Sequence, residues 1–191
     1  MRTFVAALIG GIVFFVWGAL SHMVLHLGDT GMHYGTPYQA TLAALQQDGA
    51  QGGVFFLPST PQDKMSDAAA QKALAEEAAG MGYAFVVYAP NGNPASTAMG
   101  PILGLQFATD FLSAFIVAHI LGLVALPFAR RVAIAMGLGV FAWLVVSVPY
   151  WNWYLFPLDY TLGLLGKYAI GWTLAGAAIA WWLGRGERRA T

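Results

Sequence analysis

Four long, nearly uninterrupted apolar stretches constrain the fold of this chain more than any other feature of its sequence. They cover residues 3–26, 101–128, 132–150 and 160–183. A helix needs about 20 predominantly apolar residues to cross a hydrocarbon core of about 30 Å. Only 9% of the residues are charged and the mean hydropathy is +0.61, whereas a soluble domain carries about 25% charged residues. We therefore predict an all-α membrane protein built as a bundle of four transmembrane helices.

The segment between the first two stretches, residues 27–100, is too long for a structureless connection. Residues 39–47 have helical composition, and residues 67–79 predict a second helix with Ser66 as N-cap and Gly80 as its stop. GVFFL and YAFVVY are short strand-like runs, and the turn signal PNGNP follows the second. We expect a small mixed α/β cap here, which divides the chain into residues 1–26, 27–100 and 101–191.

The basic residues predict the direction of the helices. Six of the nine cations fall on one side if the chain crosses four times: Arg2, Arg130, Arg131, Arg185, Arg188 and Arg189. By the positive-inside rule, both termini are then cytoplasmic and the cap faces outward. The first stretch begins like a signal peptide, but Trp17 occupies the position where cleavage requires a small residue. We expect an uncleaved helix in a multi-pass protein of the bacterial inner membrane.

Composition also excludes several classes of function. The chain has no cysteine, which excludes disulfides, thiolate catalysis and iron–sulfur clusters. Its net charge is zero, so it carries no electrostatic footprint for nucleic acid. No glycine-rich phosphate loop and no Ser/His/Asp set stand out in the sequence. These observations favour a non-catalytic protein without a resident cofactor.

Ionisable side chains inside apolar stretches are costly and are therefore candidate sites. Asp110 and Lys167 lie at similar depths, roughly 12 Å and 10 Å below the outer starts of their stretches by helix rise. We predict that they form an ion pair or a one-water bridge that clamps two helices. Separate snorkelling of the two side chains is the alternative. A lone His119 is expected to hydrogen-bond a neighbouring helix.

The run SHMVLHLGDTGMH holds three of the four histidines. His22, His26, Asp29 and His33 would share one stripe if the helix continued, and such ligands suit copper or zinc. Gly28 and Gly31 are expected to break that helix. Hydrogen bonding at the outer membrane interface is then the simpler interpretation. A haem would need two imidazoles at one depth, whereas we expect His119 near the cytoplasmic side of the membrane and His22 near the outer side, so these two cannot hold one haem.

Two motifs carry a family resemblance: VWGALSHMVL at residues 16–25 and VPYWNWYLFPLDYTL at residues 148–162. On these motifs the chain resembles a group of small, uncharacterised bacterial four-helix integral membrane proteins. The resemblance implies the four-helix topology and no particular activity. It also implies a shared outer-face cluster: Trp17, Ser21, His22, Tyr150, Trp151, Asn152, Trp153 and Asp159. The aromatic members are equally typical of an interfacial belt.

Small residues at a spacing of four predict close helix packing at Ala6–Gly10, Ala133–Gly137, Gly171–Ala175 and Gly176–Ala180. The favoured function is an accessory, assembly or stabilising subunit of an inner-membrane complex, or a structural homo-oligomer. One alternative is an outer-interface module that binds lipid, quinone or metal near His22 and His26 and the aromatic block at 150–160. A further alternative is a small transporter or membrane enzyme that uses Asp110 and Lys167.

Overall fold

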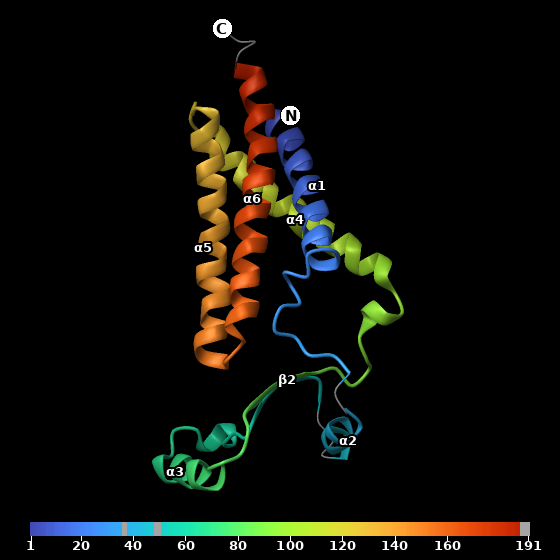
Figure 1. Ribbon diagram of the computed structural model, residues 1–191, viewed down its shortest axis with the longest axis vertical. Helices are drawn as coiled ribbons and strands as arrows, with labels where there is room; N and C mark the ends of the chain where they lie inside the picture. Colours follow the sequence, from blue (N-terminus) through green and yellow to red (C-terminus); the bar gives the residue numbers. More distant parts are fainter. Residues whose placement is uncertain (36–37, 48–50, 188–191) are drawn as a thin grey trace. The chain divides into compact units, whose positions relative to one another are not determined.

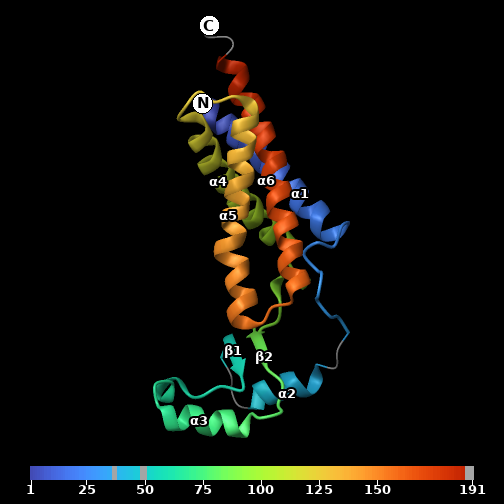
Figure 2. The ribbon, with the colours of Figure 1, turned by 60° about the vertical axis from the view of Figure 1, so that its left-hand side comes forward.

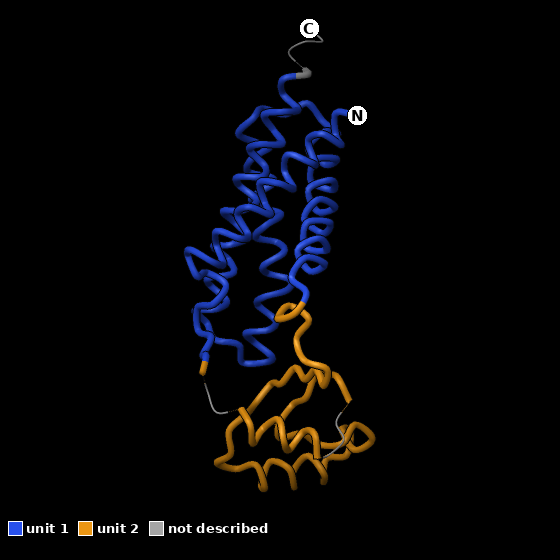
Figure 3. The backbone as a smooth tube through the Cα atoms, turned by 90° about the vertical axis from the view of Figure 1, so that its right-hand side faces the viewer, with its two compact units in different colours: residues 1–34, 98–191 blue, residues 35–97 orange. Residues whose placement is uncertain are grey.

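The computed structural model of the protein describes residues 1–35, 38–47 and 51–187 (Figure 1). The chain is mostly helical, and four of its helices are long and apolar enough to cross a membrane. A two-stranded sheet lies in the sequence between the first and second of these helices. This much of the fold class predicted from the sequence is confirmed. The chain forms two compact units, a helical unit of residues 1–34 and 98–191 and a cap unit of residues 35–97 (Figure 3).

The helical unit contains four long helices whose ends differ by several residues from the apolar stretches. They are α1 (Arg2–Met23), α4 (Met99–Gly122), α5 (Phe128–Tyr154) and α6 (Leu158–Glu187). Pro127 and Pro157 stand directly before α5 and α6, where a residue without an N–H donor can begin a helix. α5 continues to Tyr154, so much of the predicted interfacial aromatic cluster is helical.

By their contacts, the four helices pack in the order α5, α6, α1, α4, and α4 crosses obliquely behind α6 and α1 in the view of Figure 1. α6 packs along both α5 and α1, and α1 packs along α4. α4 and α5 are consecutive in the chain, yet they scarcely touch each other. The arrangement is therefore an open bundle in which α4 and α5 form the edges and α1 and α6 form the middle.

Adjacent glycines let α1 approach both of its neighbours. A Cβ added at Gly10 would lie 2.6 Å from the Ile179 side chain on α6, and one added at Gly11 would lie 3.0 Å from the Phe111 backbone on α4. Such close approach favours helix association in lipid, where no hydrophobic effect drives it. The core of small and aromatic side chains surrounds these contacts: Ala6, Ala7, Phe14, Ala114, Val117, Ala118, Leu121, Ala135, Trp172, Ala175, Ile179 and Leu183.

Three of the four predicted small-residue pairs lie in helix contacts, and one does not. The pair Ala133–Gly137 is exposed on α5. The buried pair on this helix is Ala135–Gly139, and a Cβ at Gly139 would lie 2.6 Å from the Tyr168 carbonyl oxygen. A pair of small residues four apart does pack on α5, but it lies two residues later than predicted. Which pair is buried depends on where α6 contacts α5.

The start of α1 and the end of α6 lie at one end of the helical unit, together with the junction of α4 and α5 (Figure 2). Arg2 donates a hydrogen bond to the Leu183 carbonyl at the last turns of α6. Arg185 lies 4.0 Å from the Trp181 ring centroid, and Arg131 is only 1% exposed at the start of α5. We call this the arginine end, defined by Arg2, Arg130, Arg131 and Arg185. Arg188 and Arg189 lie outside the described residues.

The cap unit contains the elements that the sequence predicted. It comprises α2 (Gln39–Gln47), β1 (Gly53–Leu57), the 3₁₀ turn Gln62–Lys64, α3 (Ala68–Glu77), β2 (Ala84–Tyr88) and the 3₁₀ turn Pro94–Ser96. The two strands pair antiparallel, with Phe55 opposite Val86. The N-cap of α3 is Asp67 rather than Ser66, because the Asp67 carboxylate accepts from the amides of Ala69 and Ala70.

Candidate functional site

α1 ends at Met23, earlier than predicted, and this changes the geometry of the histidines. The Leu27 amide donates to the Ser21 carbonyl at 2.8 Å, and His26 adopts a left-handed backbone with φ of 53°. Left-handed residues commonly close helices, although glycine usually occupies the position. Because α1 ends before His26, the stripe that His22, His26, Asp29 and His33 would share on a continuous helix does not form. We call the segment that follows, residues 24–34, the histidine loop.

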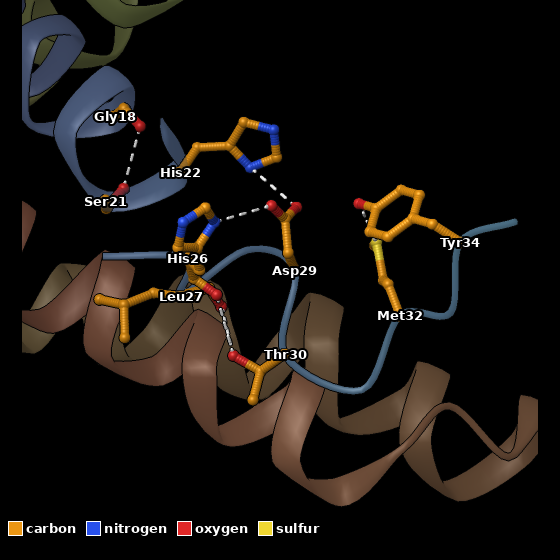
Figure 4. A network of polar contacts seen from close by, with 9 residues as sticks. All are labelled: Gly18, Ser21, His22, His26, Leu27, Asp29, Thr30, Met32 and Tyr34. Carbon is orange, nitrogen blue, oxygen red and sulfur yellow. Dashed lines mark hydrogen bonds and ion pairs between the residues drawn. The ribbon is translucent and has the colours of Figure 1, made fainter. Parts of the chain in front are cut away.

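The histidine loop folds back so that Asp29 meets both nearby imidazoles (Figure 4). Asp29 Oδ1 lies 3.2 Å from His22 Nδ1, and Asp29 Oδ2 lies 3.5 Å from His26 Nδ1. The Asp29 side chain is 21% exposed, whereas those of His22 and His26 are 57% and 69% exposed. One shielded carboxylate thus holds two largely solvated imidazoles.

Tyr34 completes this network at the far side of the loop. Desolvation, followed by the charge of Asp29 and a hydrogen bond to its carboxylate, raises the pKa of Tyr34 above the usual value of a tyrosine. The Tyr34 hydroxyl also lies 3.7 Å from the Met32 sulfur (Figure 4). Asp29 is therefore the centre of a polar network that ties the end of α1 to the loop.

The structure brings three of the four predicted metal ligands together. His33 is exposed, and no contact joins it to Asp29 in the described part of the chain. Among the described residues, no three His, Cys, Asp or Glu side chains are arranged to hold a metal ion. The end of the helix before His26 explains why these residues do not form the predicted metal site. The loop turns the Asp29 carboxylate toward the two imidazoles, where it acts as a hydrogen-bond acceptor.

Two glycines seat the histidine loop on the first turns of α6. A Cβ at Gly163 would collide with the Leu27 carbonyl oxygen, and one at Gly31 would lie 2.5 Å from Asp159 Oδ1. Gly31 also has a φ of 76°, which favours glycine. Thr30 adds hydrogen bonds to the carbonyls of His26 and Leu27 at 3.1 and 3.3 Å. The loop is thus built into the helical unit, which extends to Tyr34.

The cluster implied by the family resemblance is only partly assembled. Trp17 Nε1 donates to the Lys167 carbonyl at 2.8 Å, and a Cβ at Gly171 would lie 2.5 Å from the Trp17 ring. Ser21 is fully buried and donates to the Gly18 carbonyl at 3.0 Å. His22 and Asp159 both contact the histidine loop, at Asp29 and Gly31. Trp17 and Asp159 thus connect α1 and its loop to α6, whereas Ser21 and His22 make contacts within α1 and its loop.

The aromatic members of that cluster lie mostly apart from the loop. The Tyr150 ring packs on Tyr154 and Phe156, with ring centroids 5.4 and 5.2 Å away. Trp151, Asn152 and Trp153 are exposed on α5, and Trp153 is 75% exposed. This exposure is typical of an interfacial belt. The family resemblance implied that these residues lie together, but their direction around α5 depends on how that helix packs against α6.

Asp110 is buried on α4, with an exposed fraction of 6%. Its Oδ1 accepts a hydrogen bond of 2.8 Å from the Gln106 amide, one turn earlier on the same helix. Among the described residues, no direct ion pair joins Asp110 to Lys167, although the Lys167 charge acts on the carboxylate at longer range. A water-bridged contact between them stays a prediction. Sequence reasoning missed Gln106, whose spacing of four from Asp110 on one helix was the available signal.

The sequence predicted a hydrogen bond from His119 to a neighbouring helix, and none is present among the described residues. His119 lies exposed in the last turn of α4, at the level of the arginine end. A second tryptophan does serve as a bridge, since Trp143 Nε1 on α5 donates to the Thr161 carbonyl on α6 at 2.7 Å. Trp17 and Trp143 thus bind backbone carbonyls on α6 from opposite sides. No sequence pattern marked this role, because tryptophan is also common at membrane surfaces.

A scan against protein-family models and searches of curated proteins and of solved structures found no match for this chain.

Proposed function

We propose that this protein is a non-catalytic component of the bacterial inner membrane that assembles with or stabilises other membrane helices. The observation that carries the proposal is the open order of the helical unit. α1 and α6 have neighbours on both sides, whereas α4 and α5 each have a free side. An edge helix in lipid can accept a further helix without rearrangement of the core.

The polar contacts of the helical unit support the same proposal. Trp17, Trp143 and Arg2 all donate to backbone carbonyls of α6. Each such contact joins another helix to α6 and uses the hydrogen-bond donor of the side chain. Groups used in this way hold a scaffold together rather than bind and release a substrate.

The position of the cations supports a topology with both termini in the cytoplasm. Arg2, Arg130, Arg131 and Arg185 lie at one end of the four helices. The positive-inside rule then assigns the arginine end to the cytoplasm and the histidine loop to the outer surface.

Co-purification tests the proposed function directly. The tagged chain is expressed at native level, extracted in mild detergent and analysed by native mass spectrometry, with the tag on an unrelated four-helix protein as control. We expect either a stoichiometric partner subunit or a defined homo-oligomer. A protein that is monomeric and copurifies with no other subunit would contradict the proposal.

A second candidate function is an outer-interface module that binds a metal, a lipid or a quinone. It is favoured by one observation, the two exposed imidazoles that flank Asp29. Metal analysis of the purified protein, with His22→Ala and His26→Ala as controls, tests its metal form. Stoichiometric metal that is lost in both variants would establish a metal-binding module, and metal-free protein would exclude it.

A further inference from the structure

The uncharged polar side chains of α4 all lie along one exposed line of the helix. The line contains six residues at alternating spacings of four and three: Ile102, Gln106, Thr109, Ser113, Ile116 and Ile120. All six are exposed. The five intervals span 18 residues and average 3.6 residues, so the six positions stay on one line of a straight α-helix. We call this line the α4 seam.

The α4 seam is distinct from the face with which α4 packs inside the chain. That inner face consists of Asp110, Ala114, Val117, Ala118 and Leu121, all of them buried. The seam lies beside it, on the edge of the open bundle. The helix therefore has a buried inner face and, beside it, an exposed line that carries its Gln, Thr and Ser side chains.

The polar groups of the seam would be poorly satisfied by lipid. The Ser113 hydroxyl has no hydrogen-bond partner among the described residues, and Thr109 bonds only to the Gln106 carbonyl of its own helix at 2.8 Å. Gln106 uses its amide nitrogen to hold Asp110, which leaves its amide oxygen available as an acceptor. Side chains of this kind hydrogen-bond across helices in membranes.

We infer that the α4 seam binds the α4 seam of a second copy of this chain, in a parallel two-fold dimer. This inference rests on the proposed membrane function and names the partner. An amide or a hydroxyl both donates and accepts, so a helix with Gln, Thr and Ser at seam positions is complementary to itself. Copies inserted in the same direction place their α4 helices parallel, with each seam residue opposite its own counterpart.

The geometry of such a dimer follows from the seam alone. Gln106, Thr109 and Ser113 occupy successive positions in the middle of the contact, and the isoleucines pack at its two ends. A polar residue at a seam position fixes the register of paired helices. Each Gln106 amide would then be shared between Asp110 of its own chain and Gln106 of the partner.

The absence of cysteine from the chain allows a direct test by disulfide cross-linking in native membranes. Single cysteines are placed on the seam as Thr109→Cys, Ser113→Cys and Ile116→Cys. The matched controls are Leu105→Cys, Ala108→Cys and Leu112→Cys, which are also exposed and lie on the outward side of the same helix. We expect ~10-fold more cross-linked dimer from the seam positions than from the controls.

Each other outcome overturns the inference. Equal cross-linking at both sets would indicate random collision, and preferential cross-linking of the controls would place the contact elsewhere. Seam cysteines that link to a protein of different mass would identify a heterologous partner. That result would support the proposed accessory function and exclude a second copy of this chain as the partner of the α4 seam. If no cysteine variant forms a cross-linked dimer and the protein still copurifies with a partner complex, the dimer is excluded and the accessory function is supported.

Discussion

The two ends of the helical unit are held together by different physical means. At the arginine end, long cationic side chains reach backbone carbonyls and an aromatic ring, as Arg2 reaches Leu183 and Arg185 covers Trp181. At the other end, the histidine loop approaches α6 so closely that glycine is required at Gly163 and Gly31. Long flexible side chains tolerate substitution, whereas backbone contacts do not. We therefore expect the histidine end to be the more sensitive of the two.

The largest effect is expected at Gly163. In Gly163→Ala, the new methyl group collides with the Leu27 carbonyl, and overpacking of this kind costs about 1–3 kcal/mol. The measurement is the free energy of unfolding in detergent. Gly166→Ala is the matched control, because its Cβ would lie 3.8 Å from the Leu27 side chain, an ordinary contact. Equal stabilities of the two variants would show that the loop does not sit on α6 in this way.

Between the two ends, the predicted Asp110–Lys167 contact can be tested by a double-mutant cycle. We expect Asp110→Asn and Lys167→Met to lower the free energy of unfolding singly, and the double variant to recover part of the loss. Interaction energies of contacting residues are about 0.5–3 kcal/mol. Additive losses would show that no water bridges the two groups. Because the Gln106 hydrogen bond survives in Asp110→Asn, the cycle reports on charge alone.

A smaller effect is expected at His26, where the left-handed backbone is unfavourable for any residue with a Cβ. The left-handed conformation costs about 1–2 kcal/mol in residues other than glycine. His26→Gly should therefore unfold at a higher denaturant concentration than His26→Ala, although both lose the contact with Asp29. If the alanine variant is as stable as the glycine variant, His26 does not close α1.

The smallest effect concerns the titration of Tyr34. Its raised pKa means that the neutral phenol is favoured in the folded protein, so the associated stability is present below the unfolded pKa and is lost as the pH rises through the folded pKa. Asp29→Asn removes the charge and should lower this pKa, while desolvation keeps it above the usual value. The phenolate absorbance at alkaline pH, with Tyr34→Phe subtracted, measures the shift. An unchanged titration would show that the Asp29 carboxylate does not act on the Tyr34 hydroxyl.

The comparison of the two ends also shows which features the sequence could predict. Hydropathy and the nine cations were sufficient for four helices and a common arginine end, since both depend only on local composition. The cap elements followed from local turn and cap chemistry, and Ser66 was displaced by Asp67 because both are good N-cap residues. These are properties of short segments.

The candidate site depended on contacts between distant segments, and there the sequence was insufficient. Nothing distinguishes Gly163 from the other 22 glycines until Leu27 is known to lie against it. His26 carries no sequence signal for a left-handed backbone. The direction of Trp151 and Trp153 around α5 depends on where α6 packs. Sequence therefore placed residues by height along a helix, and the tertiary contacts placed them around it.

The most direct test of the whole account is the side of the membrane on which each end lies. Single cysteines are introduced at Arg130 and at His33, both exposed and at opposite ends of the helical unit. Intact cells are treated with a membrane-impermeant thiol reagent, before and after permeabilisation. We predict that His33→Cys is labelled on intact cells and that Arg130→Cys is labelled only after permeabilisation. Labelling of Arg130→Cys on intact cells would contradict the proposed topology.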